Sequence, residues 1–371
     1  MNILLITGSY PNMKCGVGDY TNILARYLKK TGLNIKILTS DNDNVIEDGI
    51  SIRLIKDWNF KCIIDIIKYC KENKVNILHI QYPTQGYGFK IGINILPLYL
   101  KFYNLFMSKK VKVITTLHEF SQSHILRKIS MIPLIMFSDK IITTNKEEKD
   151  VIMKWLPFIK ETKIEIINIG SNIMPHKETE DIKNSNHIIT YFGFIRPDKG
   201  LDNLIRAIML TKVYKEDDFK LNILAELNYN NKYHREILKL IDNISFDKNK
   251  INITGYLPDY DISKYLYNTN LSVLPFKDGL TYRRGSFIAS IVHNLPVIST
   301  YTNLTSKDLL DFLNEYLVEP NNEQELAKAI DRFFYDISYR NKLIEKVKKM
   351  KDLFDWNKIA LKHKRLYKEL E

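Results

Sequence analysis

Two short basic segments contain the residues whose types and spacing best suit the binding of a diphosphate. The first segment, Tyr191–Gly200 (YFGFIRPDKG), carries Arg196 and Lys199 directly before an expected helix. The free N–H groups and the positive dipole end of a helix N-terminus favour an anion. A guanidinium can bind two phosphate oxygens at once, whereas an ammonium acts as a point charge. Taken alone, this segment is equally well explained as a solvated basic turn.

The second segment, Lys277–Ser286 (KDGLTYRRGS), adds Arg283 and Arg284 at the start of another expected helix. Ser286 is predicted to cap that helix, and Gly285 would let the backbone come close to a ligand. Two pairs of cations at two helix starts of one sheet are harder to explain as solvated surface. Together they predict a diphosphate cradle.

The first half of the chain offers weaker candidates. The segment Gly8–Asp19 (GSYPNMKCGVGD) has neither a dinucleotide-binding G-x-G-x-x-G nor a P-loop, but its Gly16 and Gly18 would let a ligand lie against the backbone. His118 follows an expected strand in TTLHEF, although a lone histidine is more often structural. His79, inside the strand LHIQY, is predicted to be buried and hydrogen-bonded.

Strands and amphipathic helices must position these residues, and they alternate along the whole chain. Asp19 is predicted to cap the helix Tyr20–Lys30, which Gly32 ends. The strands expected in the first half are Asn2–Thr7, Asn34–Ser40, Ile77–Tyr82, Lys112–Leu117, Lys140–Thr144 and Ile164–Ile169. Those expected in the second half are His187–Phe194, Leu221–Glu226, Ile251–Leu257, Leu271–Phe276 and Pro296–Thr300, with helices at Leu201–Leu210, Tyr260–Asn268 and Ser286–His293.

Repeated strand–helix–strand units predict an α/β protein with doubly wound parallel sheets. The polar stretch Pro175–Asn186 (PHKETEDIKNSN) interrupts the alternation and is predicted to be a linker. We therefore expect two Rossmann-like domains facing across a cleft, at 1–175 and 176–354, with a C-terminal helix at 355–371 that packs back on the first domain. Ligands of such sheets bind beyond the carboxyl ends of the strands.

The composition suits a cytoplasmic protein with two ordinary hydrophobic cores. The chain has 371 residues, of which 45% are hydrophobic, and its three cysteines show no paired spacing. The opening segment has no basic region before its short apolar run, so no signal peptide is predicted. Asp41-Asn42-Asp43 has the Asp-x-Asp spacing of a divalent-metal site, but it lies in a polar turn after the second strand and is interpreted as solvated, so no metal is expected.

The positive charge is concentrated in the first half, where Met1–Pro175 has 24 Lys and Arg against 15 Asp and Glu, or +9 of the total +12. This charge favours an anionic membrane face or a phosphorylated acceptor, or it reflects a generally lysine-rich composition. Nucleic acid is not expected, because no binding motif is present. The apolar run Ile91–Leu100 is too short to span a bilayer, and it is either a helix packed on the sheet or an interfacial helix with nearby Lys90, Lys101, Lys109 and Lys110.

With these segments in view, the chain resembles the family-4, group 1 nucleotide-sugar glycosyltransferases, which have two Rossmann-like domains (the GT-B fold). The resemblance covers nearly the whole length, and its motifs are specific only in combination. They are CGVGDYTNILARYLKKTGLNIKILT, IINIGSN, YFGFIRPDKGLDNLIRAI, ITGYLPDYDISKYLYNTNLSVLPF and HNLPVIST. In IINIGSN, Asn172 replaces the Asp of the family's usual segment.

The resemblance implies a site and an activity. It implies His118, Asp19, Arg196 and Lys199 as catalytic residues, with His118 near the donor sugar and Asp19 near the acceptor opening. Implied donor-binding residues are Gly16, Gly18, Gly193, Arg196, Lys199, Gly255, Tyr256, Leu257, Asp278, Arg283, Arg284, Gly285 and Ser286. The family's pair of spaced Glu residues is replaced by Thr281 and Ala289, so the chain is similar to a subset with RRGS at this place.

The predicted function is transfer of a hexose from a nucleotide diphosphate sugar to a glycan or lipid-linked acceptor, in cell-surface polysaccharide or glycoconjugate synthesis. By resemblance, transfer would retain the anomeric configuration and need no metal or other cofactor. The missing Glu pair leaves two alternatives open. These are a nucleotide-sugar epimerase of the same architecture and a non-catalytic nucleotide-sugar-binding or assembly subunit.

Overall fold

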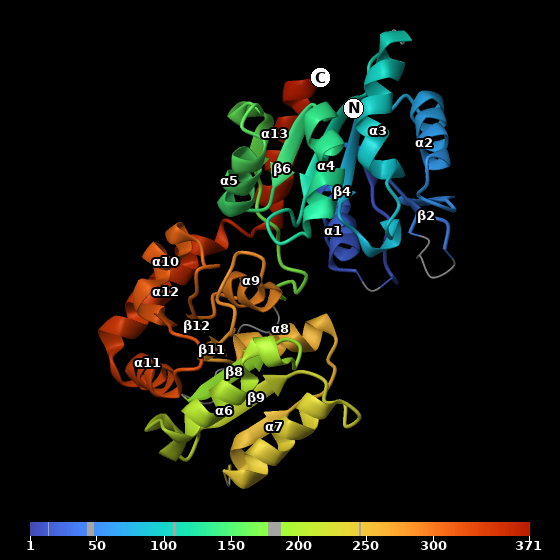
Figure 1. Cartoon of the computed structure of the whole chain (residues 1–371). Coiled ribbons are helices and arrows are strands. Elements are labelled where there is room, and N and C mark those ends of the chain that lie inside the picture. Colours follow the sequence, from blue (N-terminus) through green and yellow to red (C-terminus); the bar gives the residue numbers. More distant parts are fainter. Residues whose placement is uncertain (14, 43–47, 107–108, 177–186, 245) are drawn as a thin grey trace. The chain divides into compact units, whose positions relative to one another are not determined.

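The computed structural model describes residues 1–13, 15–42, 48–106, 109–176, 187–244 and 246–371, which form two compact units (Figure 1). Unit 1 contains Met1–Gly170 and Trp356–Glu371, and unit 2 contains Ser171–Asp355. The sequence places the first boundary at 175/176 and the return to the first unit at 355. Most of the predicted linker, residues 177–186, lies outside the described residues.

Unit 1 is built on a seven-stranded parallel sheet with the order β3-β2-β1-β4-β5-β6-β7. Strands β2, β4 and β5 have the predicted ends, and β1, β6 and β7 end one to three residues before theirs, whereas β3 was not predicted. The strands are β1 (Asn2–Ile6), β2 (Asn34–Ser40), β3 (Ser51–Ile55), β4 (Ile77–Tyr82), β5 (Lys112–Leu117), β6 (Lys140–Thr143) and β7 (Ile164–Ile166).

Helices alternate with the strands of unit 1. They are α1 (Gly16–Lys30), α2 (Lys61–Glu72), α3 (Gly92–Tyr103), α4 (Ile125–Phe137), α5 (Lys146–Trp155) and α13 (Trp356–Leu370). The last of them comes from the far end of the chain, and Figure 1 shows this red helix among the blue and green elements of unit 1. Its Trp356 packs on Tyr20 and Tyr27 of α1, with ring centroids 5.3 and 5.9 Å apart.

The predicted start of α1 is wrong. The helix begins at Gly16 rather than Tyr20, its N-cap is Cys15, and Asp19 lies in its first turn instead of capping it. Gly18 is therefore helical, and a Cβ there would lie 2.7 Å from the carbonyl oxygen of Ser9. Gly18 therefore lets the backbone of Ser9 pack closely against α1, whereas a Cβ at Gly16 would meet no atom within 4 Å. The predicted end is confirmed, because Gly32 follows the C-cap with φ +86°.

Unit 2 is built on a six-stranded parallel sheet with the order β10-β9-β8-β11-β12-β13. The strands are β8 (Ile188–Phe192), β9 (Lys220–Leu224), β10 (Ile251–Ile253), β11 (Leu271–Leu274), β12 (Val297–Thr300) and β13 (Leu317–Val318). The helices are α6 (Leu201–Met209), α7 (Lys232–Asn243), α8 (Asp259–Tyr267), α9 (Gly285–Val292), α10 (Lys307–Leu313), α11 (Glu323–Tyr335) and α12 (Ile337–Lys351). The predicted two-domain α/β fold is confirmed.

One predicted cap in unit 2 is also wrong. Helix α9 begins at Gly285 with Arg284 as its N-cap residue, so Ser286 lies inside the first turn. Asn294 takes the predicted left-handed conformation after this helix, with φ +56°. Gly200 starts α6 with φ +70°, and a Cβ there would lie 1.9 Å from the carbonyl oxygen of Pro275. Only glycine lets the chain enter α6 this close to the segment after β11.

Helix α3 contains the apolar run that the sequence leaves between two interpretations. It buries Ile93, Leu96 and Leu100 in the core of unit 1, as a helix packed on a sheet does. Tyr99 and Phe102 remain 49% and 60% exposed near its C-terminal end. No helix in the described part of the chain is long and apolar enough to cross a bilayer.

Candidate functional site

The two basic segments of unit 2 meet because the strands before them are neighbours. Strand β8 pairs with β11, and the segments follow the carboxyl ends of these two strands. The backbone N–H of Lys277 donates to the carbonyl oxygen of Asp198 over 2.9 Å, which ties one segment directly to the other. This convergence at neighbouring strand ends is the arrangement that the sequence predicts.

In the first segment, a single carboxylate holds both predicted cations. The Asp198 side chain accepts from Nε and Nη2 of Arg196, each over 2.9 Å, and its Oδ2 lies 3.0 Å from Nζ of Lys199. The hydrogen bond from Arg196 is the main reason that the pKa of Asp198 lies far below its usual value. The Arg196 side chain is 60% exposed and that of Lys199 only 16%, so the two cations differ in their access to water.

In the second segment, Arg284 reaches the same place as Lys199. The guanidinium of Arg284 lies 4.5 Å from the centre of the Phe276 ring, and Nζ of Lys199 lies 5.4 Å from that centre. Burial, followed by the charge of Arg284, lowers the pKa of Lys199. Two positive charges this close repel each other. Asp198 and Asp278 offset part of this repulsion, and an anion with two negative groups would offset more of it.

Arg284 also retains hydrogen-bonding capacity. Its guanidinium pairs with the carboxylate of Asp278, and its Nη2 donates to the carbonyl oxygen of Gly279 over 3.2 Å. Its buried Nε has no hydrogen-bond partner among the described residues. A buried donor of this kind is costly unless a ligand satisfies it, and a phosphate oxygen is a suitable acceptor.

The remaining predicted donor-binding residues of unit 2 lie at the same edge of the sheet. A Cβ at Gly193 would come 3.8 Å from the Oγ of Ser286, so the end of β8 lies beside the first turn of α9. Arg283 and Gly285 flank Arg284 at the start of that helix. Gly255, Tyr256 and Leu257 follow the edge strand β10, where Tyr256 is 81% exposed and Gly255 has φ +75°.

The two positions that usually carry Glu in the resembled family offer no carboxylate here. Thr281 is buried before α9, and Ala289 is fully buried within the helix, in a core cluster with Leu224, Leu266 and Leu295. The nearest carboxylates in the basic segments, Asp198 and Asp278, are already paired with cations. The donor would therefore meet mainly positive charge in this part of unit 2.

Unit 1 places His118 at the carboxyl end of β5, partly buried. Its Nε2 lies 2.9 Å from Oε1 of Gln81, and its ring packs edge-on against Tyr20 with centroids 4.9 Å apart. Burial lowers the pKa of His118 to about 3, so its ring is neutral near pH 7. Asp19 lies in the first turn of α1 and directly precedes Tyr20, whose ring contacts His118. His79 is buried and hydrogen-bonded, as predicted.

The sequence did not single out three residues that organise these sites. Asp198 holds two cations, Phe276 contacts both Lys199 and Arg284 with its ring, and Gln81 contacts His118. Asp198 could have been found from its place between Arg196 and Lys199. Nothing local in the sequence marks Gln81, because its contact with His118 joins two strands 37 residues apart.

These features define a class of fold: two α/β units, each built on a parallel sheet with alternating helices, which is the GT-B fold. Solved structures share it over the full chain. A glycosyltransferase from Rickettsia africae has 20% sequence identity and a TM-score of 0.73, covering 100% of this chain and 98% of that one. The Anabaena protein Alr3699/HepE, solved in complex with UDP, has 12% identity and a TM-score of 0.73, covering 100% of both chains.

Sequence comparison is more specific for the second half of the chain. The model of the family described as "Glycosyl transferases group 1" matches residues 186–336, which supports the predicted resemblance. An uncharacterised glycosyltransferase of Methanocaldococcus jannaschii, MJ1178, is 25% identical over 236 residues. That match covers 63% of this chain and 60% of the relative, so the chain matches less than two thirds of that protein's length.

Proposed function

We propose that this protein transfers a sugar from a nucleoside diphosphate sugar to a glycan or lipid-linked acceptor. The observation that carries the proposal is the convergence of Arg196, Lys199 and Arg284 at the ends of β8 and β11. The group 1 glycosyltransferase match covers all of these residues. The UDP in the Anabaena structure makes UDP-sugars the first donors to test.

These cations would act on the leaving group. As the bond from the anomeric carbon to the diphosphate breaks, negative charge builds up on the phosphate oxygens. Fixed positive groups that meet this charge lower the barrier, because they need no reorganisation during the reaction. Lys199 and Arg284 are already held against Phe276, so their positions are largely set before the donor binds.

The finer features of the reaction are also proposals. With no Glu at Thr281 or Ala289, we propose that the diphosphate cradle supplies most of the stabilisation, and that Asp278 and Ser286 take over polar contacts to the donor. We propose His118 as the group near the donor sugar and Asp19 as the group near the acceptor. Retention of anomeric configuration without a metal is proposed on the resemblance, and the product's anomeric NMR signals with EDTA present would test it.

The test of the proposal is a transfer assay on the Arg196→Ala variant. Loss of one charge-assisted contact should cost about 1.5–3 kcal/mol, which is about a tenfold to hundredfold fall in turnover. Arg206→Ala is a matched control, since Arg206 is an exposed arginine on α6 that pairs with Glu323 instead. Equal transfer rates in the wild type and the Arg196→Ala variant would refute the assignment.

The same assay separates the two alternatives. A nucleotide-sugar epimerase would change the donor with no acceptor present, and it needs positioned acids and bases where unit 2 presents cations. A non-catalytic subunit would bind the nucleotide and turn over no donor in a panel of donors and acceptors. Transfer that requires acceptor would exclude both.

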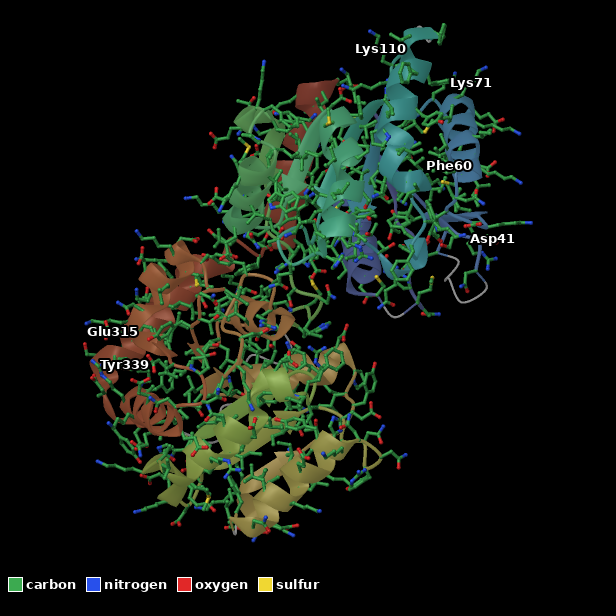
Figure 2. The ribbon with its side chains drawn as sticks, in the orientation of Figure 1. Asp41, Phe60, Lys71, Lys110, Glu315 and Tyr339 are labelled. Carbon is green, nitrogen blue, oxygen red and sulfur yellow. The ribbon has the colours of Figure 1, made fainter. Side chains whose placement is uncertain are left out.

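We also propose that unit 1 contacts an anionic membrane face. Beyond α3, Leu105 and Phe106 are 73% and 86% exposed, and the chain carries no Asp or Glu from residue 73 to residue 118. Figure 2 shows Lys110 beyond α3 and Lys71 at the end of α2, at the same end of unit 1. Exposed aromatic groups beside lysines suit the interface of an anionic bilayer. Lys90, which the sequence also places at the lipid phosphates, pairs instead with Asp57, so its charge is partly neutralised within the protein.

Vesicle sedimentation tests this contact. The protein should pellet with vesicles of phosphatidylcholine and phosphatidylglycerol, and less with phosphatidylcholine alone. A variant with Phe102→Ser and Phe106→Ser should lose the binding. Ile337→Ser is the control, because Ile337 is a comparably exposed apolar residue of unit 2, at 64%. The proposal would be contradicted if the pelleted fraction changed neither with the lipid charge nor in the Phe102→Ser and Phe106→Ser variant.

A further inference from the structure

A chain of hydrogen bonds runs through the interior of unit 1 from the C-terminal helix to His118. The hydroxyl of Tyr367 on α13 lies 2.7 Å from Nδ1 of His79 on β4. The side-chain nitrogen of Gln81, two residues further along β4, lies 3.1 Å from Nε2 of His79. Its side-chain oxygen lies 2.9 Å from Nε2 of His118. Tyr367, His79 and Gln81 are all fully buried.

The orientation of the Gln81 amide, with its nitrogen toward His79 and its oxygen toward His118, sets where the protons lie in this chain. The amide nitrogen of Gln81 can only donate, and its oxygen can only accept. Nε2 of His79 must therefore accept the hydrogen bond from Gln81. The hydroxyl of Thr116, 2.7 Å away, is then a second donor to the same nitrogen. Nε2 of His118 must carry a proton and donate it to Gln81. A neutral His118 then has a lone pair on Nδ1, which has no hydrogen-bond partner among the described residues.

The surroundings keep both rings neutral and hold His118 in place. The titratable groups that pack on or act on these two rings include Tyr20 on α1, and His363 and Tyr367 on α13. Burial lowers the pKa of His118 and that of His79, and the neighbouring His363 lowers both further. Tyr20 packs against the His118 ring while Gln81 binds its edge, which leaves the ring little freedom to turn.

We propose that Gln81 is a positioning residue that holds His118 as the Nε2-protonated tautomer, leaving Nδ1 to accept a hydrogen bond from a sugar hydroxyl. Tyr367 and His79 hold Gln81 from the side opposite His118, so the C-terminal helix α13 sets the state of the residue that follows β5. The sugar contact rests on the proposed function, whereas the tautomer does not. A fixed acceptor would favour donors with a hydroxyl in one orientation.

The tautomer can be measured directly on the full chain. Long-range proton–nitrogen NMR with ¹⁵N-labelled histidine distinguishes protonated from unprotonated ring nitrogens, and a His118→Asn variant assigns the His118 signals among the eight histidines. At pH 7, Nε2 of His118 should be protonated and Nδ1 unprotonated. A proton on Nδ1, or a charged ring, would overturn the inference whatever the enzyme turns out to transfer.

Two substitutions at one position separate positioning from mere packing. Gln81→Leu removes the acceptor, and His118 should become a mixture of tautomers with a turnover about tenfold lower. Gln81→Glu keeps an oxygen facing His118, so the Nε2-protonated signature should return, and with it part of the turnover. Because its second oxygen can only accept, His79 should then carry its proton on Nε2 and accept from Tyr367 at Nδ1. Near-UV circular dichroism checks the fold, and Gln81→Met replaces the leucine variant if that variant unfolds.

The outcomes of this experiment distinguish the two proposals. An unchanged His118 spectrum in the folded Gln81→Leu or Gln81→Met variant would overturn the positioning role. Absence of transfer by the wild type with every donor and acceptor would instead overturn the proposed function, while the wild-type spectrum would still decide the tautomer.

Discussion

The carboxyl edges of the two sheets use opposite chemistry. In unit 2, Arg196, Lys199 and Arg284 are charged, and Asp198 and Asp278 balance them within two short turns. In unit 1, His118 is neutral and is held by a buried amide. Charged groups suit the capture of a diphosphate, whereas a neutral fixed acceptor suits the orientation of a sugar hydroxyl. Under the proposed function, unit 2 would supply charge for the diphosphate and unit 1 a fixed acceptor for the sugar.

Acid should distinguish the units most strongly. In unit 1, burial lowers the pKa of three histidines: that of His118 to about 3, that of His363 to about 4, and that of His79 well below its usual value. In unit 2, burial lowers the pKa of His293 to about 4. Below the unfolded-state histidine pKa of about 6.5, the unfolded chain binds more protons than the folded chain. The free energy of unfolding therefore decreases as the pH decreases, by up to about 1.4 kcal/mol per pH unit for each such histidine. Unit 1 should weaken more steeply between about pH 6.5 and pH 4.5.

Tryptophan fluorescence can follow this effect, because all three tryptophans, Trp58, Trp155 and Trp356, lie in unit 1. Urea unfolding monitored by fluorescence should shift to lower urea with falling pH, ahead of the transition seen by far-UV circular dichroism, which reports both units. A fluorescence midpoint that does not move between these pH values would contradict the neutral state of the buried histidines.

The largest catalytic effect should come from removing both cations that contact the Phe276 ring. The double variant Lys199→Ala with Arg284→Ala should lower the transfer rate by roughly a thousandfold, or about 4 kcal/mol. If the two groups bind one diphosphate, this loss should be smaller than the sum of the losses in the two single variants. The reason is that both act on the charge of the leaving group. Steady-state rates of the two single variants and the double variant, with Arg206→Ala as control, would give the coupling directly. Additive single effects would show that the two residues bind separate groups.

Gly200 should be the glycine of unit 2 that tolerates substitution worst. Gly200→Ala combines φ +70° with a Cβ 1.9 Å from the Pro275 carbonyl oxygen, and it should lower the free energy of unfolding by about 3 kcal/mol. Gly32→Ala in unit 1 is the matched control, because φ is +86° there but the space is open, and about 1 kcal/mol is expected. Urea denaturation measures both. Equal losses would show that the approach to Pro275 is relaxed at no cost.

Salt should have the smallest effect and should act on one unit alone. Raising NaCl from about 0.05 M to about 0.5 M should weaken diphosphate binding about threefold, because Arg196 is exposed and its charge is screened. The His118 tautomer should not respond, since it depends on buried neutral groups. Calorimetry and the histidine spectrum at both salt concentrations would check this pair. A tautomer that changes with salt would mean that charge reaches the His118 site.

The contrast between the units also explains what the sequence could and could not predict. Arg196, Lys199 and Arg284 lie in turns that follow apolar strands. The local sequence pattern therefore predicted both these residues and their convergence at one edge of the sheet. The contact between His79 and Tyr367 joins residues 288 apart, and no local pattern carries that information. The missed strand β3 (SIRLI) is only partly buried at the sheet edge, so its apolar alternation is weak.

Helix starts were predicted less well than strands, for a physical reason. Helix α1 begins with Gly16-Val17-Gly18, and glycine disfavours helices, so the periodic signal starts later than the helix does. Helix α9 begins at Gly285, before the serine that propensity would choose as its cap. In both helices, packing of the first turn overrides the local preference: Gly18 lies against Ser9, and the first turn of α9 lies beside Gly193.

The most direct test of the central claim is calorimetric titration of UDP, GDP and ADP into the wild type, Lys199→Ala and Arg206→Ala. If unit 2 binds the donor diphosphate, at least one nucleotide should bind the wild type, and Lys199→Ala should bind it at least about tenfold more weakly while Arg206→Ala matches the wild type. Unchanged affinity in Lys199→Ala would place the diphosphate elsewhere and contradict the account.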